Sequence, residues 1–460
     1  MREQEAVAGF KAGLRGQVIT PEDPSYDYAR KVHNGMIDRK PAIIARCEDI
    51  ADVIAALRFA RENRLRISIR GGGHNAGGLG VCDDGLVIDL SPIRYVRVDP
   101  AERIVRVGGG SLWGDVDHAT HAFGLAVPSG IISTTGVGGL TLGGGLGHLT
   151  RKYGLTIDNL ISADLVLADG TFVTTSLEEH SDLFWAIRGG GGNFGVVTSF
   201  QFRAHPVHTV CAGPMLWDLK DAADVMRWYR ESIVFAPEDI NGFFAFLTVP
   251  PGPPFPAELH LKKMCGIVWC CTGSMDDANQ LLGPLRAYCR PAFEFLGPVP
   301  FPFLQSMFDP LYPAGLPMYW KADFFKELSD EAIAVHLKHG SQVPTLQSTM
   351  HLYPVNGAVH KAGSKDTAWR QRDVNWSGVI VGADPDPRNR DLITNWSRDY
   401  WQALHPFGAG GAYVNFMMEE GEDRVRAAYG ENLGRLSAIK RRYDPSNFFN
   451  ANQNIRPAAA

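Results

Sequence analysis

Long apolar runs are scarce in this sequence, so we expect neither a secretory signal nor a membrane span. Its N-terminal residues contain no apolar run long enough for a secretory signal. No window approaches the ~18 apolar residues of a membrane span. The seven cysteines show no CxxC spacing and no histidine partners at ligand spacing, which argues against a metal site. Scattered thiols of this kind are typical of reduced core residues rather than of disulfides, so we expect a cytoplasmic protein without a metal.

A strong charge of one sign is also missing. The 45 basic and 50 acidic residues give a net charge of -5, and no basic stripe is present. Proteins that bind nucleic acid or anionic membranes carry clustered lysine and arginine, so we expect neither partner. Hydrophobic residues make up 45% and charged residues 21%, which excludes a disordered chain. A length of 460 residues predicts two to three domains.

Glycine is the residue that the sequence has in excess. It supplies 50 of the 460 residues, and more than half of these lie between Gly71 and Gly195. They form three clusters, at 70–78, 136–147 and 189–195. The excess is therefore local, and this part of the chain needs backbone without side chains.

The first cluster follows a predicted strand, as in a dinucleotide-binding Rossmann motif. That motif must open a helix, whereas here the chain continues into a second strand at 86–90. Successive glycine N–H groups can instead form an anion-binding nest that approaches a pyrophosphate closely. One such loop is more often only a tight turn, but three loops around a histidine favour a cradle for a large, phosphate-bearing cofactor. His74, inside the first loop, is a candidate nucleophile toward an electrophilic cofactor carbon.

Hydrophobic patterning predicts an α+β fold. The first half has helical patterns at 49–63 and 112–123, strand patterns at 66–70, 86–90, 104–107 and 196–203, and a hairpin at 161–175 with an Asp-Gly turn. From about Val207 the strands 209–216, 243–249 and 260–272 alternate with amphipathic helices at 221–234 and 276–288. This second pattern predicts an antiparallel sheet covered by helices. A C-terminal helix is expected at about 423–442.

Several motifs match one family in order along the chain. They are Arg70-Gly-Gly-Gly-His-Asn75, Thr134-Thr-Gly-Val-Gly-Gly139, Gly143-Gly-Gly-Leu-Gly147, Arg151-Lys-Tyr-Gly-Leu155 with Asp158-Asn159, the segment 182–197, and Tyr443-Asp-Pro-Ser-Asn-Phe-Phe-Asn450. The chain thereby resembles the FAD-linked oxidases of the vanillyl-alcohol-oxidase (PCMH-type) superfamily, in the berberine-bridge-enzyme-like branch. The resemblance implies a two-part FAD-binding domain (1–206), a substrate domain (207–422) and a C-terminal segment (423–460) that completes the FAD-binding domain.

The resemblance also implies a covalent flavin. The histidine that matches His74 is bonded in the family to the 8α-methyl group of the isoalloxazine, which is expected to raise the flavin's reduction potential. Many members carry a second tether, a cysteine at the place of Ile132, so we expect one covalent bond only. The further cofactor-binding residues implied are Arg70, Gly71, Gly72, Gly73, Asn75, Gly77, Gly78, Ser133, Thr134, Thr135, Gly138, Gly139, Gly144, Gly145, Gly147, Asn159, Gly195, Val196, Val197, Asn450 and Asn452.

Two positions depart from the family pattern. Plant members place an active-site tyrosine where this chain has Leu146, so their acid–base scheme does not transfer. Thr135 stands where many members have a valine that is thought to influence oxygen access to the flavin. Threonine is similar in bulk, which favours an oxidase over a dehydrogenase.

The candidate catalytic residues come from two short strand patterns. In Tyr413-Val-Asn415 the alternation places both polar side chains on one face, at a position that matches a pocket-lining strand of the family. Tyr319-Trp-Lys321 has the same form, and burial of a lysine could lower its pKa enough for it to act as a base, although an amphipathic lysine at a strand end explains it equally. His351 is a weaker candidate, because a single histidine on a strand is usually structural.

The expected activity is that of an FAD-dependent oxidase acting on a small molecule. It would take a hydride from a C–H next to an alcohol, amine or hemiacetal and pass the electrons to O2, giving H2O2. The alternatives are an oxidative ring-forming or tailoring enzyme of secondary metabolism, a dehydrogenase that reacts poorly with O2, and a flavin-binding protein without turnover. The sequence does not indicate the oligomeric state.

Overall fold

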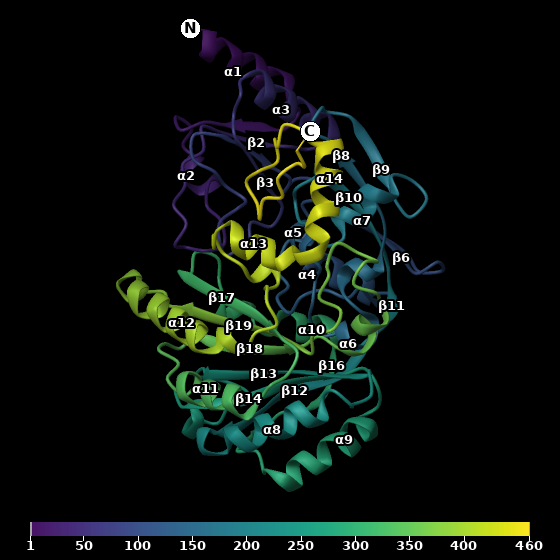
Figure 1. The fold of residues 1–460 in the computed structure, drawn as a ribbon. Coiled ribbons are helices and arrows are strands. Elements are labelled where there is room, and N and C mark those ends of the chain that lie inside the picture. The colour runs from purple at the N-terminus through teal and green to yellow at the C-terminus, as the bar shows by residue number, and fades with distance from the viewer. Residues whose placement is uncertain (1, 460) are drawn as a thin grey trace.

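The computed structural model describes residues 2–459 and contains three larger sheets (Figure 1). The first is four-stranded, in the order β1 (Gln17–Ile19), β2 (Ile43–Arg46), β4 (Leu86–Asp89) and β3 (Ile67–Arg70). β4 pairs in parallel with both β2 and β3. The helix α3 (Ile50–Glu62) begins at Asp49, whose carboxylate caps the helix by accepting the Asp52 N–H, and it buries Val53, Ala56 and Leu57 on this sheet. The N-terminal helix α1 (Arg2–Gly13) packs on α3.

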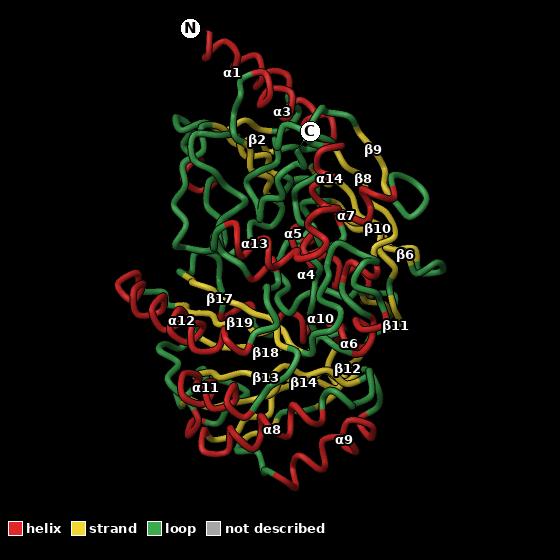
Figure 2. The backbone as a smooth tube through the Cα atoms, in the orientation of Figure 1, coloured by secondary structure: helices red, strands yellow, loops and turns green. Residues whose placement is uncertain are grey.

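The second sheet has five antiparallel strands. Their order is β5 (Val96–Asp99), β6 (Ile104–Gly108), β10 (Val196–Arg203), β8 (Leu160–Val166) and β9 (Phe172–Thr175). The predicted hairpin is confirmed as β8–β9, and Gly170 in its turn has a φ of +89°. The helices α4 (Trp113–His121), α5 (Val137–Gly143), α6 (Thr150–Tyr153) and α7 (Ser181–Ile187) and a two-stranded pair, β7 (Leu125–Ala126) and β11 (His205–Pro206), complete this half. Long loops link these elements, as Figure 2 shows.

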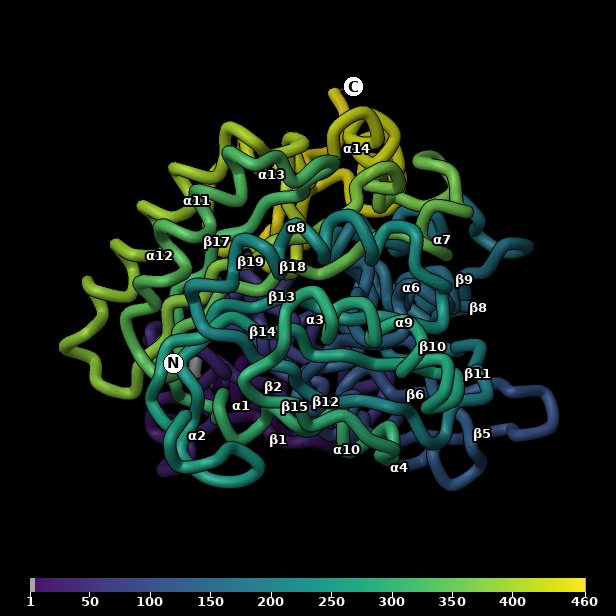
Figure 3. Tube along the Cα trace, turned by 90° about the horizontal axis from the view of Figure 1, so that it is seen from below, coloured from purple at the N-terminus to yellow at the C-terminus, as the bar shows by residue number. Residues whose placement is uncertain are grey.

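The third sheet is antiparallel, has eight strands and is formed by residues 209–383. Its main order is β15 (Phe293–Glu294), β12 (Thr209–Asp218), β14 (Lys263–Cys271), β13 (Ile240–Thr248), β18 (Thr349–Pro354), β19 (Trp376–Ala383) and β17 (Met318–Phe325), and β16 (Gly297–Pro300) also pairs with β12. The helices α8 (Ala222–Ser232), α9 (Met275–Tyr288), α11 (Asp330–Gly340) and α12 (Arg390–Leu404) lie on its outer face (Figure 3). The short helix α10 (Phe301–Ser306) packs near α4.

Successive side chains along the strands of this sheet point to its two faces in turn. On β13, Phe244 and Phe246 pack with the outer helices, whereas Phe243 and Ala245 belong to the core shared with the first half of the chain. β18 divides in the same way, because Met350 lies on the helix side and Tyr353 on the inner side. The inner face of the sheet therefore meets the glycine-rich half of the protein.

The α+β class predicted from patterning is confirmed. The segment between β3 and β4 is loop, so the first glycine cluster does not open a helix, as the sequence indicated. All seven cysteines are free thiols, and six are buried. No helix within residues 2–459 is long and apolar enough to cross a membrane. The boundaries proposed at 206/207 and 422/423 stay predictions.

The prediction of one continuous C-terminal helix at 423–442 is wrong. The structure has two helices, α13 (Glu422–Tyr429) and α14 (Leu433–Tyr443), with a 3-10 turn between them. The break lies at Gly430, whose φ of +49° is in the left-handed region and ends α13. Figure 1 shows α14 next to α7, on the glycine-rich half.

A buried ion pair fixes the C-terminal segment to the third glycine cluster. Lys440 and Asp444 are 2.7 Å apart, and both side chains are fully buried. The Lys440 ammonium also donates to the carbonyl oxygens of Asn193 and Phe449. Burial lowers the pKa of Lys440, and the Asp444 carboxylate opposes that shift. The pair thereby connects α14 to the loop at 189–195.

We expect Asp444→Asn to lower the free energy of unfolding by about 3–5 kcal/mol, because the change leaves a buried ammonium without its counter-charge. The measurement is denaturant unfolding of the purified protein, followed by fluorescence. Asp423→Asn, which alters an exposed carboxylate of α13, is the matched control and should change stability by less than about 0.5 kcal/mol. Equal stability of the two variants would contradict the role given to the pair.

Candidate functional site

A cavity of about 310 Å³ lies between the glycine clusters and the inner face of the eight-stranded sheet. Its walls come from the loops at 70–75, 130–139 and 191–195, from the C-terminal segment at 449–453, and from β17, β18 and β19. The eight-stranded sheet therefore closes the open side of the glycine loops. A volume of this size suits a bound small molecule.

Two of the glycine loops touch each other at the cavity wall. A Cβ added to Gly72 would lie 2.6 Å from the Gly136 nitrogen, and one added to Gly136 would lie 2.4 Å from the Gly72 nitrogen. Any side chain at either position would push the loops apart. The two clusters thus form one surface of backbone atoms, which can approach a phosphate-bearing group closely.

His74 lies in this wall and stacks on a second histidine. The ring centroids of His74 and His33 are 3.7 Å apart, with an angle of 22° between the planes. Burial lowers the pKa of His74 to about 3, and the neighbouring His33 adds to the shift. Burial also lowers the pKa of His33 to about 4. His74 is therefore neutral at physiological pH, and its lone pair is available to an electrophile.

Tyr413 and Asn415 face the cavity together, although the predicted strand is wrong. Residues 414–416 form the 3-10 helix η8 (Val414–Phe416), which turns the chain between the two side chains. The Asn415 Nδ2 nevertheless donates to the Tyr413 hydroxyl oxygen at 2.7 Å, and the backbone N–H of Gly145 donates to the same oxygen at 2.8 Å. With two donors on its oxygen, the Tyr413 O–H has its own proton free to donate.

The electrostatic setting of Tyr413 keeps its phenol neutral. Burial raises the pKa of Tyr413 to about 12, while the N–H donors from Gly145 and Asn415 act against the rise. Below pH 11 the group is therefore a hydrogen-bond donor held at a fixed place in the wall. Such a group can orient a heteroatom of a bound molecule.

The prediction that Tyr319 and Lys321 lie in the pocket is wrong. On β17 the cavity is lined by Met318 and Trp320, so alternation turns the side chains of Tyr319 and Lys321 to the outer face. There the Lys321 ammonium lies 2.8 Å from a Glu420 oxygen and over the ring of Trp401. Lys321 is thus part of a buried ion pair rather than a base in the cavity.

The hydroxyl of Tyr319 is likewise engaged outside the cavity. It accepts a hydrogen bond from Arg398 of α12 at 3.0 Å, and the guanidinium lies over its ring. The period-two pattern was correct, but it does not show which face of the strand meets the cavity.

Two residues of β18 that the sequence did not favour do face the cavity. His351 and Tyr353 both line it, and the His351 Nδ1 is 2.7 Å from the Tyr353 hydroxyl. Phe243 packs against both rings, at centroid distances of 4.8 and 5.0 Å. The histidine on this strand is therefore not simply a core residue.

Comparisons with known proteins agree with this arrangement. The family model described as "FAD binding domain" matches residues 41–176, and the model "Berberine and berberine like" matches residues 412–456. The FAD-linked oxidoreductase YgaK of Bacillus subtilis is 31% identical over 97% of this chain and 98% of its own length. (R)-6-hydroxynicotine oxidase of Paenarthrobacter nicotinovorans is 31% identical over 96% of this chain and 97% of its own. The crystal structure of 6-hydroxy-D-nicotine oxidase from Arthrobacter nicotinovorans superimposes with a TM-score of 0.86, at 26% identity over 97% of this chain and 98% of that one.

The chain belongs to the berberine-bridge-enzyme-like family of FAD-linked oxidoreductases. It is thus an FAD-dependent oxidoreductase, as the motifs implied. The residues of the cavity fit FAD, because the glycine loops expose backbone atoms and the wall also contains polar side-chain atoms without a partner. His33 Nε2 and Asn452 Oδ1 are buried in its wall without a hydrogen-bond partner among the described residues. The residues of the three glycine loops and of the C-terminal segment would hold the cofactor.

About half of the predicted FAD-binding residues line this cavity. They are Arg70, Gly71, Gly72, Gly73, His74, Asn75, Thr135, Gly138, Gly139, Gly195, Val197 and Asn452. Arg70 forms a buried ion pair of 2.8 Å with Asp89, so its charge is balanced within the protein. Ile132 and Leu146, the two departures from the family pattern, also line the cavity.

The remaining predicted residues do not line the cavity. They are Gly77, Gly78, Ser133, Thr134, Gly144, Gly145, Gly147, Asn159, Val196 and Asn450. Ser133 is held by Asp309 through both its N–H and its hydroxyl, and Val196 is fully buried in the core. Gly147 permits close packing, since a Cβ there would lie 2.2 Å from the Ser129 oxygen. Thr134 still reaches the FAD site indirectly, because its hydroxyl is 3.4 Å from His74 Nε2.

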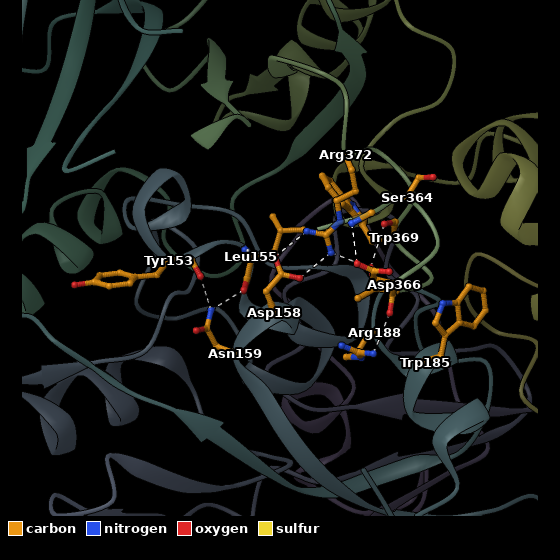
Figure 4. A network of polar contacts seen from close by, with 12 residues as sticks. Tyr153, Leu155, Asp158, Asn159, Trp185, Arg188, Ser364, Asp366, Trp369 and Arg372 are labelled. Carbon is orange, nitrogen blue, oxygen red and sulfur yellow. Dashed lines mark hydrogen bonds and ion pairs between the residues drawn. The ribbon is translucent and has the colours of Figure 1, made fainter. Parts of the chain in front are cut away.

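Asn159 is the clearest correction among these (Figure 4). Its Nδ2 donates to the carbonyl oxygens of Tyr153 and Leu155 at 2.9 Å. Its neighbour Asp158 forms a two-pronged ion pair with Arg372, at 2.7 and 2.8 Å. The Asp158-Asn159 motif thus joins segments that are more than 200 residues apart, and its role is structural.

Several cavity residues were missed altogether. His33, Tyr312, Thr349, Val379, Val381, Phe416 and Gln453 line the cavity but lie outside the matched motifs. Trp320 also lines it, although the sequence pointed to its neighbours Tyr319 and Lys321. Gly136, Gly191 and Gly192, which also line the cavity, did have a signal in the sequence, because they lie in the second and third glycine clusters. The others meet the site through long-range packing, which local patterns do not record.

Proposed function

We propose that this enzyme is an oxidase that holds FAD covalently through His74 only. It would remove a hydride from a C–H next to an alcohol, amine or hemiacetal and pass the electrons to O2, giving H2O2. The observation that carries the proposal is the neutral His74 in the wall of the cavity that Tyr413 lines. A cytoplasmic location and the lack of a nucleic-acid or membrane partner belong to the same proposal.

A single covalent bond is supported by what surrounds the cavity. Ile132 lines it at the place where a second tether is found in many relatives, and its side chain has no nucleophile. Every cysteine other than Cys289 is buried, and no cysteine lines the cavity. The imidazole of His74 is therefore the nucleophile that the geometry favours.

The chain's own contribution to the reaction is orientation and exclusion of water. When bound, FAD supplies a two-electron acceptor for the hydride. Tyr413 would donate its hydrogen bond to the heteroatom next to the reacting C–H and so orient that carbon toward the flavin. The proton that the substrate loses along with the hydride would end, together with it, in the H2O2 formed from O2. The apolar residues Val379, Val381 and Leu146 keep bulk water away from that carbon.

Reactivity with oxygen is supported by two features. Thr135 lines the cavity and is similar in bulk to the valine of many relatives, so it leaves room for O2. One relative, (R)-6-hydroxynicotine oxidase, is named as an oxidase. A dehydrogenase with poor oxygen reactivity is the second candidate, because the Thr135 hydroxyl makes this position more polar.

The test uses the purified yellow protein. A denaturing gel viewed under ultraviolet light should show flavin fluorescence on the polypeptide, and the intact mass should exceed that of the bare chain by one FAD. After reduction by a substrate without oxygen, admission of air should restore the yellow colour within seconds and produce one H2O2 per flavin. A flavin that stays reduced in air would identify a dehydrogenase, and an intact mass equal to the bare chain would refute the covalent bond.

A further inference from the structure

The part of the cavity formed by the eight-stranded sheet contains no charged side chain. The sheet contributes Met318, Trp320, Thr349, His351, Tyr353, Val379 and Val381, and the uncharged Tyr312, Tyr413 and Phe416 lie beside them, outside the sheet. Arg70, the one arginine among the residues that line the cavity, is paired with Asp89 at the glycine end. An ion moved from water into such surroundings has no counter-charge and costs several kcal/mol. The cavity therefore favours an uncharged substrate.

The walls of this part are aromatic and favour a flat molecule. Phe416 contacts the rings of Trp320, Tyr353 and Tyr413, at centroid distances between 4.8 and 5.9 Å. Aromatic walls stabilise a planar ring by stacking and edge contacts. Phe416 thus lies between Tyr413 and Tyr353, the partner of His351, and contacts both rings.

The pair His351–Tyr353 has a fixed hydrogen-bonding character. Burial lowers the pKa of His351 to about 3 and raises that of Tyr353, so both are neutral at physiological pH. If the Tyr353 O–H donates to Nδ1, then Nε2 carries a proton and the tyrosine oxygen can accept. If Nδ1–H donates to Tyr353, then Nε2 can accept and the tyrosine proton is free. In both tautomers the pair offers one donor and one acceptor.

No other group of the described chain uses this capacity. The structure gives His351 Nε2 no hydrogen-bond partner, and the Tyr353 hydroxyl bonds only to His351. Thr349, on the same face of β18, differs because its hydroxyl donates to the Phe246 carbonyl at 2.8 Å. A hydroxyl group of a bound molecule, which is uncharged and both donates and accepts, matches this pair.

We propose that His351 and Tyr353 form a specificity pair that binds a hydroxyl group of an uncharged aromatic substrate, remote from the carbon that is oxidised. The inference rests on the proposed function, since Tyr413 is taken to hold the reacting end. The substrate class is then a ring that carries one oxidisable group and a second, hydrogen-bonding hydroxyl. Both hydroxyls stay neutral in the bound state, and no bond to the pair is made.

The test compares matched probes on the FAD-containing protein. 3- and 4-hydroxybenzyl alcohol, 3- and 4-methylbenzyl alcohol, and 4-carboxybenzyl alcohol are titrated, and binding is read from the perturbed flavin spectrum and from anaerobic flavin reduction. One hydroxy probe should bind at least 10-fold tighter than its methyl counterpart, and the carboxylate should bind weakest. Failure of both hydroxy probes to bind, or equal binding of the carboxylate, would overturn the proposal.

Variants of His351 and Tyr353 test whether this pair causes the preference for the hydroxy probe over the methyl probe. Tyr353→Phe and His351→Leu should each lower the preference for the hydroxy probe by about 10-fold, whereas Thr349→Val should leave the preference unchanged. A preserved melting temperature shows that each variant is folded, and either pair variant serves if the other does not fold. An unchanged preference in a folded pair variant would overturn the proposal. Failure of the proposed oxidase function is seen separately, as flavin that leaves the denatured chain or stays reduced in air.

Discussion

His74→Ala is expected to give a folded protein that releases all of its flavin on acid precipitation, where the unmodified chain releases none. In the proposed bond the imidazole nitrogen would take the place of one hydrogen of the 8α-methyl group, and O2 would take up that hydrogen and the N–H hydrogen of the ring as H2O2. Alanine has no nucleophile, and Ile132 cannot replace it. The glycine cradle of Gly72 and Gly136 is untouched, so FAD should still bind without a covalent bond.

The readouts are flavin fluorescence on a denaturing gel and intact mass, which do not depend on turnover. The melting temperature with and without added FAD shows whether the variant is folded and still binds the cofactor. His208→Ala, which alters an exposed histidine outside the cavity, is the matched control and should retain covalent flavin. Flavin that remains on the denatured His74→Ala chain would mean that another residue forms the bond.

The elements of the fold could largely be predicted from the sequence because their signals are local. The helix α3 carries its cap, Asp49, and its apolar stripe within 14 residues, and the hairpin β8–β9 carries its Asp-Gly turn. The break at Gly430 had a signal as well, since a glycine inside a helical pattern marks a candidate end. The three glycine clusters likewise indicated the cofactor cradle.

The substrate side of the site could not be predicted in the same way. Tyr319 and Trp320 are adjacent on β17, and which of them meets the cavity depends on the face that the outer helices cover. That choice is made by packing between segments far apart in the sequence. β18 is buried on both faces, so its pattern gave no sign that His351 lines a cavity rather than a core.

Tyr413 and Asn415 were correctly predicted to lie together in the site, but the local structure predicted for them was wrong. A shared face was inferred from strand alternation, whereas η8 brings the side chains together by a turn. The hydrogen bond from the Gly145 N–H, 268 residues away, is what gives Tyr413 its orientation. Contacts of this range are set by the docking of the sheet on the glycine loops, and one sequence does not record them.

Tyr413→Phe is expected to slow flavin reduction by about 10²-fold while the affinity for substrate changes by less than about 5-fold. The ring remains and keeps its packing on Phe416, so the lost atom is only the hydroxyl that orients the substrate heteroatom. Because the pKa of Tyr413 is about 12, this donor stays protonated throughout pH 6–10. Its contribution to the reduction rate should therefore be constant across that range, and the rate ratio of the two proteins should not vary with pH.

The measurement is stopped-flow reduction of the flavin without oxygen, over a range of substrate concentrations and pH. Tyr312→Phe removes another phenol hydroxyl from the cavity wall and is the matched control, with an expected change of less than 3-fold. Asn415→Leu should slow reduction by about 10-fold, because Tyr413 keeps its proton but loses one of the two donors that fix its oxygen. If reduction by Tyr413→Phe is as fast as in the unmodified protein, Tyr413 does not orient the reacting group, and that role belongs to another residue of the cavity.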